Sequence, residues 1–227
     1  MSLLEELAQA VEYGKTADVA ALIERGVAEG VSAQDMLSNG LIRGMKGLGV
    51  KFKNHQVFVP EVLIAARTLK KGSETLKHLL IDEKIEPIGK AVTATVKGDL
   101  HDVGKNLVRI MLEGVGFKVI DLGVDVSTDA IIDSIRVHTP DVLALSALLN
   151  TTLNQLANVI RDVGDAGLRG QVKIMVGGAP VDEEFAKRIG ADAYADNAVA
   201  AAEVAKQLLE TDQKVGGAKI VKESDDV

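Results

Sequence analysis

The sequence predicts an α/β protein in which an N-terminal four-helix bundle is followed by a doubly wound, five-stranded parallel sheet. Its 227 residues are 47% hydrophobic but only 3% aromatic, with 22 Gly against 4 Pro. Apolar residues recur at helical spacing as far as about Leu80, and from Lys90 onward short β-branched runs alternate with helical stretches. The first pattern indicates helices packed on helices, and the second is typical of parallel strands joined by crossover helices.

Four helices are predicted in the first half of the chain. The apolar spacing places them at Leu4–Val11, Ala17–Ala28, Ser32–Met45 and from Pro60 to about Leu80. The third begins with a Ser-x-x-Asp pattern that resembles a capping box, and the fourth has Pro in its first turn, where a missing N–H is tolerated. Gly47–Pro60 contains glycines and is therefore predicted to be a connection, although it is more apolar than a solvated loop. We expect it to cover another part of the molecule or to be covered.

Five βα units are predicted in the second half. The strands are expected at Ala91–Val96, Lys118–Leu122, Val142–Ser146, Val172–Val176 and Asp192–Ala195. The helices are expected at Val103–Leu112, Thr128–Val137, Thr152–Val163, Asp182–Ile189 and Ala198–Leu209. Such units make a flavodoxin-like (Rossmann-type) domain, in which the carboxyl ends of the first and third strands meet where the strand order reverses. Ligands bind at that switch point, so we expect the site there.

The organisation predicted along the chain is a helical bundle cap domain at residues 1–85, a ligand-binding α/β domain at 86–212 and a charged, flexible tail at 213–227. Ile81–Gly89 is charged and contains Pro87, as interdomain linkers do. The charged end from Thr211 is expected to fray.

Charge and composition exclude several classes of function. The 26 Lys and Arg against 33 Asp and Glu give a net charge of −7, which argues against nucleic acid as a partner. The absence of Cys excludes a disulfide, a cysteine-ligated metal and a thiolate nucleophile. The acidic start Met1–Leu7 is unlike a secretory signal, and no apolar run reaches the about 18 residues of a membrane span. We expect a cytoplasmic protein with no membrane partner.

The loop after the first predicted strand carries the residues with the most chemistry. Lys97–Asn106 reads Lys-Gly-Asp-Leu-His-Asp-Val-Gly-Lys-Asn. It is not a phosphate loop. Five residues rather than about four separate Gly98 from the Gly104-Lys105 pair, and Asn106 stands where a phosphate loop carries Ser or Thr. It is not a phospho-acceptor receiver site, because the third strand ends in Ser146 instead of Asp. Two interpretations of His101 remain, a polar residue that caps the next helix and a metal ligand.

A metal-ligating imidazole needs an acceptor on its second ring nitrogen, which fixes the tautomer. Asp99, two residues before His101, is spaced to be that acceptor. His55, His78 and His138 lie elsewhere at unrelated spacings, so the chain does not supply the several ligands of a protein-only transition-metal site. One histidine backed by one carboxylate fits a metal whose other ligands come from a macrocycle.

Three separated pieces of the sequence resemble the cobalamin-binding signature. They are Asp99-x-His101-x-x-Gly104, Ser146-x-Leu148 and Gly177-Gly178. The helical half, particularly Met45–Pro60, resembles the cap module of methionine synthase and of the corrinoid proteins of anaerobic methyltransferase systems. The resemblance covers roughly Leu3–Leu209. A cap and a cobalamin domain without a fused catalytic domain resemble the small methyl-carrier protein of those systems, which is not catalytic alone.

The resemblance implies a bound cobalamin or related corrinoid, carried as methylcobalamin. His101 would be the lower ligand of cobalt in place of the cofactor's own base (His-on, base-off), Asp99 would accept from its ring, and Thr152 would complete a His–Asp–hydroxyl relay. The remaining cofactor contacts implied are Gly98, Leu100, Asp102, Gly104, Ser146, Leu148, Asn150, Gly177, Gly178 and Ala198, with Phe52 and Val59 of the cap over the methyl-bearing face. At Ser38 the sequence departs from that of methionine synthase, which has an acidic residue near the cofactor at the matching position.

Taken singly, several of these residues have plainer interpretations. Gly177-Gly178 would be a tight turn, Ser146 and Thr152 would be helix-capping groups, and the cap residues would be bundle core. Only the joint order of the three pieces favours the cofactor.

The resemblance also implies protein partners. These are a substrate-specific methyltransferase, a corrinoid:tetrahydrofolate or corrinoid:coenzyme M methyltransferase, and a reductive activator. The methyl donor stays open between methanol, a methylamine, a betaine and an aryl methyl ether. Alternative functions are a cobalamin-dependent mutase subunit, a cobalamin-sensing regulator and a helical interaction module on an empty flavodoxin-like scaffold. Against the first two, the sequence has no substrate barrel and no basic helix-turn-helix arm.

Overall fold

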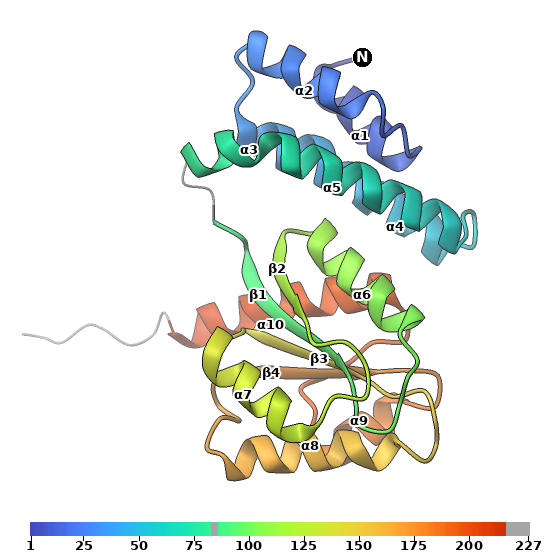
Figure 1. Ribbon diagram of the computed structural model, residues 1–227, viewed down its shortest axis with the longest axis vertical. Helices are drawn as coiled ribbons and strands as arrows, with labels where there is room; N and C mark the ends of the chain where they lie inside the picture. The colour runs from blue at the N-terminus through green and yellow to red at the C-terminus, as the bar shows by residue number, and fades with distance from the viewer. Residues whose placement is uncertain (83–85, 217–227) are drawn as a thin grey trace, which may run out of the picture.

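The computed structural model describes residues 1–82 and 86–216, which form a helical bundle followed by an α/β domain (Figure 1). The bundle consists of α1 (Leu3–Glu12), α2 (Val19–Ala28), α3 (Ala33–Asp35), η1 (Met36–Ile42), α4 (Arg43–Lys53) and α5 (Val59–Asp82). The short α3, the π-helical η1 and α4 follow one another without a break, so the bundle has four helical rods. The predicted four-helix bundle is confirmed.

Side-chain caps lie at the N-termini of two of these rods. Ser2 and Glu5 form a capping box in which each side chain accepts from the other residue's N–H, at 2.9 and 3.3 Å. The Ser32 hydroxyl accepts from the N–H of Asp35 at 3.1 Å. Small residues then let the rods approach, because a Cβ on Gly44 would overlap the carbonyl oxygen of Ala8 in α1.

The prediction that Gly47–Pro60 is a connection is wrong for its first half. α4 continues to Lys53, so only the residues between it and Val59 connect two helices. The glycines here serve close packing instead of a turn, since a Cβ on Gly49 would lie 2.9 Å from the Met111 side chain of the α/β domain. The apolar character of the segment follows from this packing, because buried Leu48 belongs to the same hydrophobic cluster as Met111.

The α/β domain is an alternating series of strands and helices. In chain order these are β1 (Gly89–Thr95), α6 (Val103–Gly114), β2 (Phe117–Asp121), α7 (Thr128–His138), β3 (Val142–Ser146), α8 (Leu153–Asp165), β4 (Lys173–Gly177), α9 (Glu183–Ile189), β5 (Ala193–Tyr194) and α10 (Ala198–Gly216). All strand pairs are parallel, in the order β2-β1-β3-β4-β5. This is the flavodoxin-like order, so the predicted switch point between β1 and β3 is confirmed.

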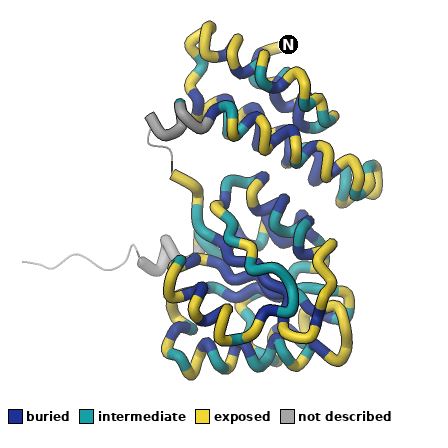
Figure 2. The backbone as a smooth tube through the Cα atoms, in the orientation of Figure 1, coloured by how far each residue is buried: buried dark blue, intermediate teal, exposed yellow. Residues whose placement is uncertain are grey.

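Helices cover both faces of the sheet (Figure 1). One face packs against α7, α8 and α9 through alternate residues such as Val92, Leu143 and Ile174. The other packs against α6 and α10 through Ala91, Val142, Ala144 and Met175. Figure 2 shows the buried positions concentrated in the strands and on the inward sides of the helices. The core residues are almost all aliphatic, as the composition predicts.

The bundle lies on the α6 and α10 side of the α/β domain. A single hydrophobic cluster joins the bundle core to α6 and α10, and its members from these two helices are Leu107, Ile110, Met111, Ala198, Val199 and Ala202. Gly114 at the end of α6 approaches Met45 so closely that a Cβ would lie 2.7 Å from its Cγ. The cap and the sheet domain thus share a core in this arrangement.

Two predicted segments fall partly outside the described residues. Of the predicted linker, residues 83–85 are not described, while α5 reaches Asp82 and β1 begins at Gly89. Of the predicted tail, 213–216 continue α10 and 217–227 are not described. Within the described part of the chain, no helix is both long and apolar enough to cross a lipid bilayer.

Candidate functional site

The loop between β1 and α6 holds His101 at the carboxyl edge of the sheet. The Thr95 hydroxyl at the end of β1 donates to the carbonyl oxygen of His101 at 3.0 Å and lies 2.9 Å from the Ser146 hydroxyl at the end of β3. Gly98 has φ +83°, a conformation that lets the chain turn back beneath His101. The ends of the two strands that flank the switch point therefore fix the backbone of the histidine.

Asp99 lies at the centre of a hydrogen-bond network behind the imidazole. The side chain of Asp99 is fully buried, whereas that of His101 is 50% exposed. Asp99 Oδ1 lies 2.8 Å from His101 Nδ1 and accepts the His101 N–H at 3.1 Å. Because an ionised carboxylate only accepts, Nδ1 carries the proton, and Nε2 is the ring nitrogen available to a metal.

The second oxygen of Asp99 is bound by the segment after β3. It accepts the N–H of Leu148 at 2.7 Å and of Leu149 at 3.3 Å. Thr152 Oγ1 lies 2.8 Å from the same oxygen and 2.9 Å from the Leu149 carbonyl oxygen. The structure therefore brings together the three residues of the relay that the sequence analysis describes, across about fifty residues of chain.

Asp99 is held in its ionised form. Burial raises the pKa of its carboxyl, but the hydrogen bonds from Leu148, His101 and Thr152 outweigh burial, so this pKa lies well below its usual range. A permanent acceptor behind Nδ1 holds the imidazole in one orientation and one tautomer.

We expect the stability that Asp99 provides to depend on pH. A carboxyl whose folded-state pKa is lowered contributes stability that is fully present above its unfolded-state pKa of about 3.9 and is lost as the pH falls toward the folded-state pKa. Urea unfolding of wild type and Asp99→Asn should therefore show a difference in unfolding free energy that is constant near neutrality and shrinks below about pH 4. The exposed Asp133→Asn should show no such trend. A difference for Asp99→Asn that persists unchanged to pH 2 would contradict this account.

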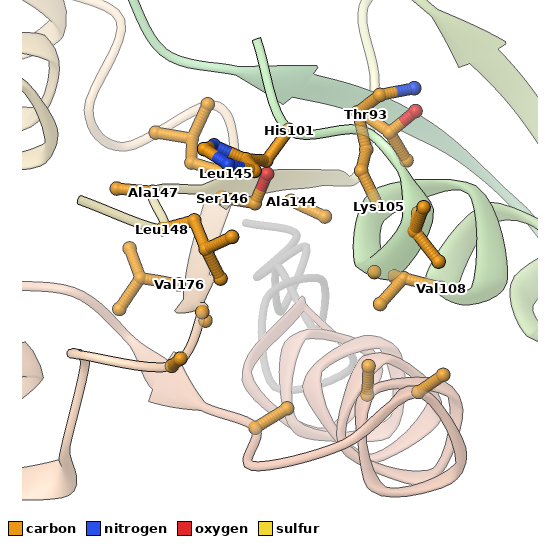
Figure 3. Close-up of a pocket in the computed structure, with 18 of the residues that line it drawn as sticks. Thr93, His101, Lys105, Val108, Ala144, Leu145, Ser146, Ala147, Leu148 and Val176 are labelled. Carbon is orange, nitrogen blue, oxygen red and sulfur yellow. The ribbon is translucent and has the colours of Figure 1, made fainter. Parts of the chain in front are cut away.

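A cavity of about 570 Å³ opens beside His101, between the sheet and the α6 and α10 layer. Figure 3 shows His101 and Leu148 on one side of it, with Lys105 and Val108 on the other. The cavity exists because this part of the sheet face and of α10 carries small residues, among them Ala144, Ser146, Gly177, Ala195, Ala198 and Ala201. Its lining is mostly apolar, so it suits a long organic group.

Gly177 and Gly178 allow two backbone segments to meet at the cavity wall. A Cβ on Gly178 would overlap the carbonyl oxygen of Ala147, and its φ of +130° is one that side-chain-bearing residues rarely adopt. A Cβ on Gly177 would lie 2.9 Å from the Ala195 carbonyl oxygen. Gly178 is therefore required for both packing and conformation, and Gly177 for packing.

Lys105 is a buried cation in the cavity wall that the sequence analysis did not single out. Its side chain is only 3% exposed, and its Nζ lies 2.6 Å from Asp121 Oδ1 and 3.0 Å from Asn106 Oδ1. Burial raises the pKa of Asp121, but the bonds from Lys105 and from the Gly123 N–H outweigh it and lower that pKa. The pair joins the first turn of α6 to the end of β2.

We expect Lys105→Met to lower the free energy of unfolding by about 1–3 kcal/mol, because Asp121 loses its cation while it stays three-quarters buried. Urea denaturation of the ligand-free protein measures this. Lys187→Met removes a lysine from an exposed pair with Glu183 and should cost less than about 0.5 kcal/mol. Equal losses in the two variants would show that burial of the Lys105 pair has no energetic consequence.

The other predicted site residues lie in four places. Those that line the cavity with His101 are Leu100, Asp102, Gly104, Ser146, Leu148, Gly177, Gly178 and Ala198. Gly98, Asp99 and Thr152 lie behind His101, and Asn150 is exposed on the loop after β3. Phe52 and Val59 do not line this cavity; they are partly buried against the bundle core.

Sequence reasoning missed Thr93, Thr95, Lys105 and Asp125. The two threonines alternate along β1 with Val92 and Ala94, and polar residues in a buried strand were a signal that could have found them. Within residues 1–82 and 86–216, no group of three or more His, Asp and Glu side chains could hold a metal ion. His101 therefore belongs to no such cluster among the described residues.

Comparison with known proteins agrees with this geometry. Models described as "B12 binding domain" match residues 3–77 and 89–203. The chain is 39% identical over 208 residues to the dimethylamine corrinoid protein of Methanosarcina barkeri, which spans 91% of this chain and 97% of that protein. This chain belongs to the B12-binding corrinoid protein family. A second relative of this corrinoid protein, from Desulfitobacterium hafniense, is 35% identical over 92% of this chain and 98% of its own.

Two solved structures share the arrangement of this corrinoid protein. A cobalamin-binding protein from Desulfitobacterium hafniense aligns with TM-score 0.77 and 30% identity, over 92% of this chain and 98% of that one. A chain of the methanol:cobalamin methyltransferase complex from Methanosarcina barkeri aligns with TM-score 0.83 and 25% identity, over 92% of this chain and 80% of that one. The helical cap followed by a Rossmann-like domain is thus common to these proteins.

Proposed function

We propose that this protein carries a methyl group on a corrinoid, between a methyltransferase that loads it and a second one that unloads it. The observation that carries the proposal is the half-exposed His101 at the mouth of a mostly apolar cavity, with Nδ1 held by buried Asp99. A histidine oriented by a carboxylate, without further protein ligands, suits a metal that arrives inside a macrocycle.

The residues present fit such a cofactor. The cavity runs from His101 along α6 and α10 and is kept open by small residues, including the two glycines of its wall. A group of the length of a nucleotide tail would enter it if the cofactor's own base did not occupy the metal. Leu100 and Val103 lie exposed beside His101 and would present apolar surface to the ring. We infer that the cofactor binds base-off with His101 as lower ligand.

The chain's own residues hold the ligand and its proton. His101 would hold a bound corrinoid, which would supply the cobalt centre that carries the methyl group between the two partners. Asp99 and Thr152 keep the proton on Nδ1 and leave Nε2 as the donor atom.

The relatives favour a methylated amine as the methyl donor. Relatives from Methanosarcina at 39–40% identity are dimethylamine corrinoid proteins, and a solved neighbour comes from a methanol complex. We propose a methylamine-specific methyltransferase as the loading partner, a corrinoid:coenzyme M or corrinoid:tetrahydrofolate methyltransferase as the unloading partner, and a reductive activator. Phe52 and Val59, near the α4–α5 connection, are proposed to shield the methyl-bearing face after a movement of the cap.

Reconstitution tests the carrier role. The ligand-free protein is mixed with hydroxocobalamin, separated from free cofactor by gel filtration, then reduced and methylated. We expect one corrinoid per chain, and loss of the methyl group to coenzyme M or tetrahydrofolate only when an acceptor methyltransferase is added. Failure to retain corrinoid would contradict cofactor binding. Retention without transfer to either acceptor, in the presence of active partner enzymes, would favour the mutase subunit or the sensing regulator.

A further inference from the structure

Asp125, in the connection between β2 and α7, has a backbone conformation that a side chain disfavours. Its φ is +54°, in the left-handed region, and it is one of three non-glycine residues with positive φ in the described part of the chain. Aspartate adopts this conformation more readily than most side-chain-bearing residues, because its short carboxylate can hydrogen-bond to nearby backbone.

The side chain and the backbone of Asp125 bind the turn that immediately precedes His101. Asp125 Oδ1 accepts the N–H of Gly98 at 2.8 Å, and the N–H of Asp125 donates to the carbonyl oxygen of Asp99 at 2.9 Å. Asp125 Oδ2 also lies 3.0 Å from Lys97 Nζ. These bonds keep the carboxylate ionised, since the Gly98 N–H first and Lys97 second lower its pKa.

The same connection follows β1 past the end of the sheet. The Thr95 N–H donates to the Gly123 carbonyl oxygen, and the Val126 N–H donates to the Thr95 carbonyl oxygen, each at 3.0 Å. Val96 and Val126 form a parallel bridge beyond the named strands. The chain from Thr95 to Asp99 is therefore bound along one side by the β2–α7 connection.

Asp99 is consequently held from two directions. Its carboxylate is bound by the segment after β3, through Leu148, Leu149 and Thr152. Its backbone carbonyl is bound by Asp125. The first set fixes where the acceptor oxygens lie, and the second fixes the backbone from which both Asp99 and His101 project. Without the second, the Gly98 turn would keep the bond from the Asp99 N–H to the Val96 carbonyl oxygen at 3.1 Å but would lose its link to the β2–α7 connection.

We propose that Asp125 is a positioning residue for the metal ligand, and that its hydrogen bond to the Gly98 N–H sets how well His101 Nε2 meets the cobalt of a bound corrinoid. Asp125 touches neither the cavity nor His101 and acts through the Gly98–Asp99 backbone. This inference rests on the proposed function, because it concerns the geometry of the same ligand.

Variants at Asp125 separate the hydrogen bond from the backbone conformation. Asp125→Gly permits the positive φ and removes the acceptor, whereas Asp125→Asn keeps an amide oxygen as acceptor and tolerates this φ. Thr139→Gly is the matched control, because Thr139 is also left-handed, with φ +45°, but lies at the far end of α7. Each full-length variant is titrated with hydroxocobalamin. Its reduced Co(II) form is then examined by electron paramagnetic resonance for splitting by an axial nitrogen.

We expect Asp125→Gly to bind hydroxocobalamin about 10-fold more weakly than wild type, which is the lower end of the range for groups that orient metal ligands. A smaller share of its cobalt should be coordinated by nitrogen. Asp125→Asn should stay within about threefold of wild type, and Thr139→Gly should match it. An Asp125→Gly protein that equals wild type in both measurements would overturn the inference. So would equal losses in Asp125→Gly and Asp125→Asn, because the acceptor would then not matter.

A measurement without cofactor keeps the inference separate from the proposed function. Amide hydrogen exchange of the ligand-free wild type should show a protected Gly98 N–H, and this protection should be lost in Asp125→Gly. A rapidly exchanging Gly98 N–H in wild type would overturn the inference even if Asp125→Gly does not fold. If wild type fails to bind corrinoid while the Gly98 N–H is protected, the proposed function fails and the role of Asp125 toward a metal ligand fails with it. Nitrogen-coordinated cobalt in wild type, unchanged in Asp125→Gly, would leave the proposed function intact and reject the inference alone.

Discussion

Replacing His101 with alanine is expected to weaken the binding of hydroxocobalamin by about 100-fold or more and to abolish nitrogen coordination of the cobalt. Loss of a group that merely orients a metal ligand costs about 10- to 100-fold, so loss of the ligand itself should reach at least the upper limit. The absorption spectrum of any corrinoid that remains bound should change to one without a lower nitrogen ligand. Titration followed by visible absorption measures both effects.

The fold should survive His101→Ala. The side chain is half exposed, and its removal leaves Asp99 with its bonds from Leu148, Leu149 and Thr152. His138→Ala, at the opposite end of α7 from the connection that binds the loop, serves as the control and should bind the cofactor as wild type does. Added imidazole should restore nitrogen coordination in His101→Gly. Wild-type affinity and spectrum in His101→Ala would show that the histidine is not the ligand.

Gly178→Ala is expected to have the second large effect, a loss of about 2–4 kcal/mol in the free energy of unfolding together with weaker corrinoid binding. The new Cβ would overlap the Ala147 carbonyl oxygen, and the φ of +130° disfavours any side chain. Relief of this overlap requires movement of the segment after β3, and the same segment supplies the Leu148 N–H that donates to Asp99. Urea denaturation of the ligand-free protein and titration with hydroxocobalamin measure the two losses.

Gly164→Ala is the matched control for the change from glycine to alanine. Gly164 lies in α8 with open space where the Cβ would stand, so alanine there should leave stability unchanged or raise it by up to about 1 kcal/mol. Corrinoid binding should not change. If Gly178→Ala matched Gly164→Ala in stability and affinity, the close approach of Gly178 to Ala147 would not shape the site.

The fold could be predicted from the sequence because its signals are local and repeated. Each strand is a short β-branched run, each crossover has a helical period, and parallel pairing leaves few possible orders. The error at Gly47–Lys53 has a physical cause. Glycine in that segment permits contact with Met111 on α6, and close packing between distant segments cannot be distinguished from a turn by composition alone.

The centre of the site could also be predicted, because Asp99 and His101 lie two residues apart in one loop. Thr152 was found only through the order of motifs in a resembling family. Lys105 and Asp125 were missed because their partners, Asp121 and Gly98, lie 16 and 27 residues away and meet them only when β2 pairs with β1. The cavity likewise depends on small residues from strands that become neighbours only in the sheet.

We propose that a ring nitrogen of His101 binds the cobalt, and the rest of the site is interpreted from this bond. Its most direct test is electron paramagnetic resonance of the Co(II) form of the full-length protein loaded with cobalamin, prepared once with natural histidine and once with histidine labelled with ¹⁵N in the ring. We expect the nitrogen splitting to change from triplets to doublets with the label, and both patterns to disappear in His101→Ala. Triplets that persist in the labelled protein would contradict this proposal, because they would show that the cofactor's own base still occupies the lower position.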